Sequence, residues 1–353
     1  MNMEDLRKEI DRIDFQIVEL LSRRAEKVLQ IAKIKERKGE SYYSPGREKV
    51  VLERLLTQNK GPLPDEELKE IIKTILKAYL SLQKKLKVVY FGPPATFTHL
   101  AAIKNFGHSV ELIPARNIKE IFARVEKKQA DYGVVPVENS TEGIVSHTLD
   151  MFLDSELKIC AEIILEISHH LLGRGKLKNV KKIYSHPQAI AQCRLWLEEH
   201  LPDVKISETE STAKAAQLAS QEEDAAAIAS EVAAGLYGLR ILEAHIEDSP
   251  HNYTRFLVIG RDYAEPSGQD KTSILFSIKD RVGALYDMLA PFRAHGINLT
   301  KIESRPTKRK AWEYVFFVDF IGHKDDEPVK KALSELEERC FFLKILGSYP
   351  RGD

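Results

Sequence analysis

The feature of this sequence that most constrains its fold is an apolar repeat near the start of the chain. From Leu6 to Leu20 the apolar side chains step by four and three residues. This spacing predicts a long helix that packs along one apolar seam. The same steps continue to Arg24 and Lys35, so cations stand where the repeat requires apolar residues.

These two cations are spaced so that they can act together. Eleven helical residues bring Lys35 to within about 20° of Arg24 around the axis and roughly 16 Å further along it. Their long side chains can therefore converge on one small anion. The alternative is that both side chains reach water at the edge of the seam.

Two further helices are expected before residue 86. Ser44 and Pro45 predict a helix start, with a capping hydroxyl and a proline in the first turn, and Arg47 and Glu48 follow. In the third helix Gln83 occupies the next position of the apolar repeat. An all-helical unit with polar groups in its interior needs a ligand of complementary charge, such as a dicarboxylate.

This segment resembles the all-helical chorismate mutase family along nearly its whole length. The match rests on charged and polar residues, namely Arg7, Arg24, Lys35, Arg47, Glu48 and Gln83. The resemblance implies rearrangement of chorismate to prephenate. In that family pattern, Arg7 from a partner subunit and Arg24 hold the two carboxylates, with Arg47 completing the cationic wall. Lys35 and Gln83 face the ether oxygen.

The resemblance also implies a homodimer and places Glu48 at the ring hydroxyl of the substrate. The reaction needs no covalent step, because folding the substrate and stabilising charge on the breaking ether bond are sufficient levers. Ser44 departs from the pattern, since many relatives carry aspartate there.

Length and charge limit the classes of protein that the chain can belong to. Its 353 residues predict two or three domains. Basic and acidic residues number 53 each, which argues against a nucleic-acid binder and favours small-molecule ligands. No apolar run approaches the ~20 residues that span a bilayer, so no membrane association is expected. An acidic opening, where a signal peptide would be basic, predicts a cytoplasmic location.

Strands and helices alternate between residues 87 and 265. Strands are expected over 87–92, 110–113, 132–137, 158–167, 182–185, 225–229, 241–246 and, as a last buried strand, 257–260. Helices such as 118–128 lie between them. This order predicts an α/β domain with parallel sheets, in which ligand groups gather at the carboxyl ends of the strands. Two lobes that flank a cleft are expected.

Polar clusters at the strand ends are the candidate site. They cover residues 138–140, 185–192, 211–212 and 254–256. Any one of them could be a helix cap or a turn, but four together favour a site. No dinucleotide fingerprint, phosphate loop or metal-ligand spacing occurs, so the chemistry is expected to need neither cofactor nor metal.

These clusters resemble the prephenate dehydratase family over the full domain. The resemblance implies a two-lobed fold, with the chain returning to the first lobe for its final strand. It also implies a set of site residues, namely Glu138, Asn139, Ser185, Gln192, Thr254 and Arg255. The reaction expels the ring hydroxyl and carbon dioxide, so it needs a proton donor and fixed positive charge. Thr254 and Arg255 suit these roles, while Asn139 and Gln192 would orient the substrate.

The last segment reads strand, helix, strand, strand, helix, strand. The expected elements are 273–278, 284–294, 297–303, 314–320, 329–338 and 341–346. This βαββαβ order predicts an α+β, ferredoxin-like sandwich, which by topology alone could be a dimerisation module. Two short motifs resemble the phenylalanine-binding motifs of ACT domains, namely Gly283, Ala284 and Leu285, and Glu303, Ser304, Arg305 and Pro306. The resemblance implies an effector site at a domain or subunit interface.

Taken together, the segments predict a multidomain enzyme with domains over 1–86, 87–265 and 270–353. The order resembles the bifunctional chorismate mutase and prephenate dehydratase family. It implies chorismate and prephenate as substrates and phenylalanine as the effector. Two alternatives stay open, which are use of arogenate as substrate and a non-catalytic amino-acid sensor built on the same scaffolds.

Overall fold

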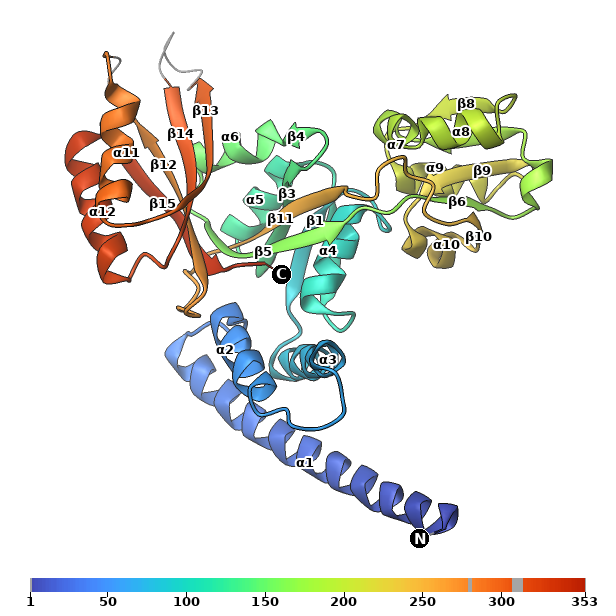
Figure 1. Ribbon diagram of the computed structural model, residues 1–353, viewed down its shortest axis with the longest axis horizontal. Helices are drawn as coiled ribbons and strands as arrows, with labels where there is room; N and C mark the ends of the chain where they lie inside the picture. The colour runs from blue at the N-terminus through green and yellow to red at the C-terminus, as the bar shows by residue number, and fades with distance from the viewer. Residues whose placement is uncertain (1, 279–280, 307–313, 353) are drawn as a thin grey trace.

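The computed structural model describes residues 2–278, 281–306 and 314–352, arranged as a helical part, two α/β lobes and a C-terminal sandwich (Figure 1). The helical part contains α1 (Met3–Lys38), α2 (Pro45–Leu56) and α3 (Asp65–Gln83). Asn2 caps α1 through a capping box, and Gly39 ends it in the left-handed conformation. The predicted all-helical class of this segment is confirmed.

Ser44 precedes α2 but does not cap it. Its Oγ donates to Glu265 Oε2 at 3.2 Å, so it ties the start of α2 to the segment that leads into the sandwich. Gly46 explains the close approach, because a Cβ there would lie 2.1 Å from the Glu265 carbonyl oxygen. The helical part is therefore anchored through α2.

The N-terminal half of α1 projects away from the rest of the chain (Figure 1). Its apolar seam has no cover, since Leu6, Ile10, Ile13, Ile17 and Leu20 are each between 44% and 60% exposed. The helix is anchored instead near its middle, where α3 packs on it. A contiguous apolar stripe of this kind is typical of a surface that another chain covers.

The first lobe is a sheet with helices on its faces. Its strands run in the order β2-β1-β3-β11-β5, with β4 paired to β3. The elements are β1 (Lys87–Phe91), α4 (Phe97–Phe106), β2 (Glu111–Ala115), α5 (Ile118–Glu126), β3 (Tyr132–Asn139), β4 (Gly143–Ile144), α6 (Ser146–Asp154), β5 (Lys158–Glu166) and β11 (Tyr253–Gly260). The chain thus returns to this lobe for β11, as expected. The expected parallel arrangement is wrong for β11, which pairs antiparallel with both β3 and β5.

The second lobe has its own sheet, in the order β10-β6-β9-β7-β8. Its elements are β6 (His170–Gly173), the 3-10 turn η1 (Leu177–Asn179), β7 (Lys182–Ser185), α7 (Pro187–Gln192), α8 (Arg194–His200), β8 (Lys205–Glu208), α9 (Thr212–Ala219), β9 (Ala225–Ala229), α10 (Glu231–Tyr237) and β10 (Arg240–Glu243). Strand β7 is parallel to β8 and β9, whereas β6 is antiparallel to its neighbours. Strands β6 and β8, which are only four residues long, were not predicted from the sequence. Two segments, 167–169 and 244–252, join the lobes.

The C-terminal sandwich has the predicted ferredoxin-like topology. Its sheet order is β13-β14-β12-β15. The elements are β12 (Asp270–Ser277), α11 (Ala284–Ala294), β13 (Leu299–Pro306), β14 (Tyr314–Ile321), α12 (Glu327–Arg339) and β15 (Phe342–Pro350). One face of this sheet packs on the first lobe, because Leu275, Phe317 and Leu346 share a core with Ile159 and Leu257.

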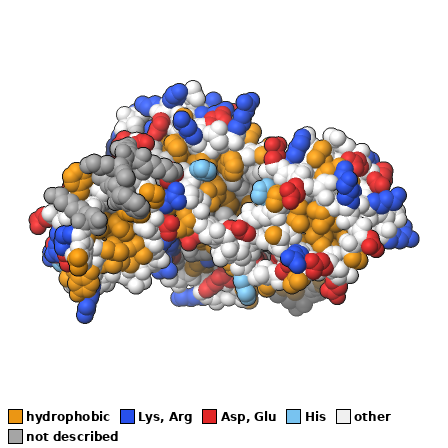
Figure 2. All heavy atoms as spheres, turned by 90° about the horizontal axis from the view of Figure 1, so that it is seen from above, with side chains coloured by type: hydrophobic (Ala, Val, Ile, Leu, Met, Phe, Trp, Pro, Cys, Tyr) orange, Lys and Arg blue, Asp and Glu red, His pale blue; other side chains and the backbone are white. Residues whose placement is uncertain are grey.

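Charge is mixed over the surface, as the balanced composition predicts. Figure 2 shows side chains of both signs interspersed on one face of the molecule. Among the described residues, no helix is both long and apolar enough to cross a membrane.

Gly347 tests the contact between the sandwich and the first lobe. A Cβ there would lie 2.2 Å from the Ile159 carbonyl oxygen, and backbone cannot yield as a side chain can. We expect Gly347→Ala to lower the free energy of unfolding by about 1–3 kcal/mol in urea titrations. Gly235→Ala is the control, because nothing lies within 4 Å of its Cβ in α10 and alanine favours a helix. Equal stabilities of both variants would contradict the tight contact.

Candidate active sites

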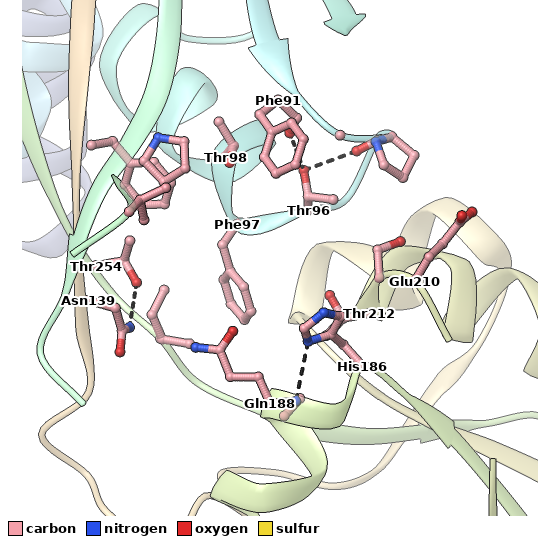
Figure 3. A pocket seen from close by; sticks show the side chains of 18 of the residues that line it. Phe91, Thr96, Phe97, Thr98, Asn139, His186, Gln188, Glu210, Thr212 and Thr254 are labelled. Atoms are coloured by element: carbon pink, nitrogen blue, oxygen red, sulfur yellow. Dashed lines mark hydrogen bonds between the residues drawn. The ribbon is translucent and has the colours of Figure 1, made fainter. Parts of the chain in front are cut away.

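A cavity of about 1020 Å³ lies between the two lobes. Figure 3 shows Asn139 and Thr254 on the side of the first lobe, with His186, Glu210 and Thr212 facing them from the second. This volume suits a small organic substrate. Among the described residues, no group of three or more His, Cys, Asp or Glu is arranged to hold a metal ion.

Strand register divides the predicted site residues between two faces of the sheet. Thr254 lies opposite Asn139, and Arg255 lies opposite Glu138. Opposed residues share a face, whereas consecutive residues of a strand point to opposite faces. Thr254 and Asn139 line the cavity, so Arg255 and Glu138 point away from it toward the sandwich.

Arg255 lies in a buried ion cluster between the first lobe and the sandwich. Its Nε is 2.7 Å from Glu162 Oε2, its Nη1 is 2.6 Å from Asp319 Oδ2, and its Nη2 donates to the Tyr349 hydroxyl at 2.9 Å. Burial opposes the charge, but these neighbours outweigh burial and raise the pKa of Arg255. All three guanidinium nitrogens therefore contact residues of the first lobe or the sandwich.

Glu138 and the sandwich strand β13 form a second contact of the same kind. Lys301 Nζ lies 2.8 Å from Glu138 Oε2. Further along β13, Arg305 donates to Ser146 Oγ at 2.6 Å and to Asp150 Oδ1 at 3.0 Å on α6. The second predicted effector motif, residues 303–306, thus contacts the first lobe through Arg305, and Lys301 contacts the same lobe just before the motif.

Asn139 sets the direction of the hydrogen bond to Thr254. Its Oδ1 accepts from the backbone N–H groups of Thr141 and Glu142, both at 3.0 Å. A backbone N–H can only donate, so the Asn139 nitrogen must be the atom that faces Thr254 Oγ1 at 2.8 Å. Thr254 Oγ1 therefore accepts this bond and keeps its own proton for a partner in the cavity.

Two other predicted residues of this domain lie apart from each other. Gln192, at the end of α7, lines the cavity and donates to Thr141 Oγ1 at 3.1 Å across the lobes. Ser185 is fully buried, and its Oγ donates to the Ile228 carbonyl at 2.8 Å. Ser185 thus ties β7 to β9 and does not line the cavity.

Two helix starts line the cavity from opposite sides. Thr96 caps α4 and Ser211 caps α9, each through its side-chain oxygen. The first N–H groups of a helix have no partner within the helix, and they attract anions. Phe97 and Thr212 begin these helices and line the cavity, so the geometry suits a ligand with two carboxylates.

The turn before α4 is strained and held in place by its neighbours. Ala95 adopts a φ of 69°, which is unusual for a residue with a side chain. Its N–H donates to His99 Nδ1 at 3.0 Å, and its carbonyl accepts from Ser230 Oγ at 3.0 Å. Ser230 belongs to the second lobe, so this turn also joins the lobes.

In the helical part, Arg24 and Gln83 both meet Tyr79 of α3. The Arg24 guanidinium carbon lies 4.6 Å from the centre of the Tyr79 ring, and Gln83 Nε2 donates to the Tyr79 carbonyl at 3.4 Å. Arg24 Nη1 is buried and has no hydrogen-bond partner among the described residues. A buried guanidinium nitrogen without a partner is suited to an anionic ligand.

Glu48 lies near the cations Lys77 and Lys35 in this helical part. Burial raises the pKa of Glu48 to about 7, although Lys77 and Lys35 act in the opposite direction. Lys35 Nζ itself donates to the Ser41 carbonyl at 2.9 Å. Lys77 was not predicted, because it falls outside the apolar repeat of α3.

The remaining predicted cations are exposed. Arg47 points into solvent on α2. Arg7 is exposed near the start of α1, and a rise of about 1.5 Å per residue puts it roughly 40 Å from Lys35. One chain therefore cannot bring Arg7 and Lys35 to the same ligand.

The predicted effector residues lie at the start of α11 and along β13. Gly283 precedes α11 with a φ of 76°, and Ala284 and Leu285 form the first turn of the helix. Glu303, Ser304 and Pro306 lie on β13 with Arg305. The motifs are thus carried by different elements of the sandwich.

Glu48 gives a test of the electrostatics in the helical part. Its folded pKa of about 7 exceeds the ordinary value of 4.5, so its contribution to stability is complete below pH 4.5 and is lost as the pH rises through 7. We expect Glu48→Gln to be about 1–3 kcal/mol more stable than the wild type at pH 8 and nearly equal at pH 4.5, in urea titrations.

The exposed Glu338 of α12 supplies the control. Glu338→Gln should change stability by less than about 0.5 kcal/mol at either pH. A stability difference for Glu48→Gln that does not depend on pH would show that burial does not perturb this carboxyl group.

Each of three regions of the chain matches a known protein family. The chain matches the family model of chorismate mutase type II over residues 6–84, prephenate dehydratase over 88–264 and the ACT domain over 272–338. A bifunctional chorismate mutase/prephenate dehydratase from Aquifex aeolicus is 54% identical over 99% of this chain and 98% of its own length.

Solved structures share the fold of the last two parts. The prephenate dehydratase of Arthrobacter aurescens in complex with L-Phe has a TM-score of 0.70 and 36% identity, covering 75% of this chain and 90% of its own. A quorum-quenching acylase, GqqA, has a TM-score of 0.69 and 30% identity, covering 75% of this chain and 98% of its own. The order of the three matched regions and the full-length identity decide the assignment: the chain belongs to the family of bifunctional chorismate mutase/prephenate dehydratases.

Proposed function

We propose that the chain rearranges chorismate to prephenate in its helical part and converts prephenate to phenylpyruvate in the cavity between the lobes. The observation that carries the second activity is the hydroxyl of Thr254. Asn139 donates to its oxygen, so the Thr254 proton is left to point into a cavity lined by two helix starts. We place the three domains over 1–86, 87–265 and 270–353, and the cytoplasmic location remains a prediction.

In the dehydratase site, the bond from the ring to its carboxylate breaks and carbon dioxide leaves. The released electron pair forms a ring double bond as the C4–O bond breaks and its electrons leave with the hydroxyl oxygen. A hydrogen bond from Thr254 would stabilise that departing oxygen, where negative charge develops. The helix starts at Phe97 and Thr212 would hold the substrate carboxylates, a role for which Arg255 was expected from the sequence.

The remaining predicted residues of this domain would act at a distance from substrate. Arg255 and Glu138 would hold β11 and β3 through the sandwich, and Ser185 would hold β7 to β9. We therefore assign them structural roles and keep Thr254, Asn139 and Gln192 at the substrate.

Acylase activity, which is named for GqqA, is disfavoured by the same geometry. A covalent mechanism needs a nucleophile whose proton a base accepts. Thr254 faces the donating nitrogen of Asn139, which cannot take its proton.

Arogenate carries an amino group where prephenate has a keto oxygen, and a parallel assay of both compounds shows which of them is the substrate.

For the mutase we propose a homodimer in which each active site takes Arg7 from the partner. The support is the exposed seam of α1 together with the long separation of Arg7 from Lys35. Arg24 and Arg7 would hold the carboxylates, Lys35 and Gln83 would face the ether oxygen, and Glu48 would meet the ring hydroxyl. Arg47 would add positive charge at the rim.

Phenylalanine is the proposed effector of the sandwich. Gly283 can bring backbone N–H groups close to a ligand carboxylate. On β13, Arg305 of the second motif and the preceding Lys301 contact the first lobe. An effector can alter catalysis only by its difference in affinity for two states, typically about 1–3 kcal/mol.

The two activities should separate by mutation. Arg24→Ala should lower chorismate rearrangement by at least about 100-fold, because a buried cation for the substrate is lost, and leave dehydration of prephenate within about twofold. Thr254→Ala should do the reverse. Rates are measured for each reaction, with and without phenylalanine, and circular dichroism checks the fold. Loss of both activities in either folded variant would refute the separate sites.

The seam of α1 gives a test of the dimer. Ile13→Glu places a charge in the apolar stripe, so we expect it to shift the chain toward monomer and to abolish mutase activity. Lys8→Glu, on the opposite side of α1, is the matched control and should stay dimeric. Analytical ultracentrifugation measures both. A wild-type chain that sediments as a monomer at micromolar concentration would rule out the proposal.

A further inference from the structure

We propose that Asn252 and His169 are positioning residues of the dehydratase site, which hold Gln192 across the cleft in one fixed hydrogen-bond direction. The inference rests on the proposed function of the cavity. Asn252 lies just before β11, and His169 lies just before β6, so they stand on the two segments that join the lobes. Both side chains are 2% exposed.

Asn252 completes a closed ring of side chains that spans the lobes. Asn139 Nδ2 donates to Asn252 Oδ1 at 2.8 Å, and Asn252 Nδ2 donates to Gln192 Oε1 at 3.0 Å. Gln192 Nε2 donates to Thr141 Oγ1 at 3.1 Å, and Thr141 Oγ1 donates to Asn139 Oδ1 at 2.6 Å. Every donor in the ring therefore meets one acceptor.

The direction of the ring follows from the backbone. The N–H groups of Thr141 and Glu142 make Asn139 Oδ1 an acceptor, so Asn139 Nδ2 must donate to an oxygen of Asn252. The Asn252 nitrogen then faces Gln192, which must present its own oxygen. No amide in the ring can turn over without opposing two donors or two acceptors.

This direction determines the tautomer of His169. Its Nε2 lies 2.8 Å from Gln192 Oε1, which accepts, so Nε2 must carry the proton. His169 Nδ1 is buried and has no hydrogen-bond partner among the described residues. Burial also lowers the pKa of His169, in keeping with a neutral ring.

The arrangement makes His169 a donor to Gln192 and leaves only its buried Nδ1 able to accept a proton. Its proton is already shared with Gln192 Oε1, and Phe97 packs edge-on against the ring with centroids 5.5 Å apart. His169 acts on the reaction through Gln192, Thr141 and Asn139, and hence on the alignment of Thr254. Its loss should therefore affect kcat more than KM.

The tautomer is tested first in the unaltered protein, by nitrogen NMR of chain labelled at histidine near pH 7.5. We expect the His169 ring to be neutral with its proton on Nε2. A proton on Nδ1, or a doubly protonated ring, would overturn the inference. This measurement does not depend on dehydratase activity, so it stands even if the proposed function fails.

A matched pair of variants then tests the role in catalysis. His169→Gln keeps an amide N–H near the position of Nε2, whereas the shorter His169→Asn cannot reach Gln192. With prephenate, we expect His169→Asn to lower kcat about tenfold or more with KM within about threefold, and His169→Gln to keep at least about a third of the wild-type kcat. Asn252→Ala should behave as His169→Asn does.

Other outcomes separate the competing explanations. Equal loss in His169→Gln and His169→Asn would mean that the imidazole itself is required, as in proton transfer. Wild-type kinetics in folded His169→Asn and Asn252→Ala would show that the hydrogen-bonded ring of side chains does not position the site. Full dehydratase activity in Thr254→Ala would instead refute the proposed function, whatever the two positioning residues do.

Discussion

The arrangement of the catalytic lobe depends on the buried guanidinium of Arg255. Glu162, Asp319 and Tyr349 surround it, and Asp319 and Tyr349 belong to the sandwich. A buried ion pair adds little net stability, but removing one partner leaves an uncompensated charge that costs about 3–5 kcal/mol. The first lobe and the sandwich are therefore held in one register, because sliding one past the other would separate these charges.

The two-residue period of β11 makes this contact part of the active site. Thr254 precedes Arg255 on one strand, and Asn139 follows Glu138 on its neighbour. One face of the sheet carries the hydroxyl and amide of the cavity, and the other carries the charges that the sandwich engages. Any shift of Arg255 or Glu138 therefore moves the backbone that also holds Thr254 and Asn139.

The cavity itself relies on oriented dipoles more than on buried charge. The hydrogen bonds in its ring of side chains all run in one direction, because two backbone N–H groups define the orientation of the Asn139 amide. Helix starts at α4 and α9 offer further N–H groups. Such groups are fixed by the fold before the substrate enters, so they need little rearrangement when charge develops. The helical part differs, since Arg24 and Glu48 are partly buried charged groups whose proposed ligand is itself charged.

The sequence by itself determined the three-part order, the helical class of the first segment and the βαββαβ class of the last, because periodicity and turn residues are local properties. It also identified Thr254, Asn139 and Gln192, which line the cavity. It did not place Arg255, Glu138 and Ser185 outside the cavity. Strand alternation predicts that adjacent strand residues point to opposite faces, but it does not say which face meets the cavity. It missed Asn252, His169 and Lys77 because nothing local marks them. Only the tertiary structure decided which face of β11 meets the sandwich, that β11 is antiparallel to its neighbours, and the direction of the amide ring. The first two follow from contacts between residues far apart in the chain, which no local pattern encodes. The direction of the ring starts from the local N–H groups of Thr141 and Glu142, but it reaches Gln192 only through the distant Asn252.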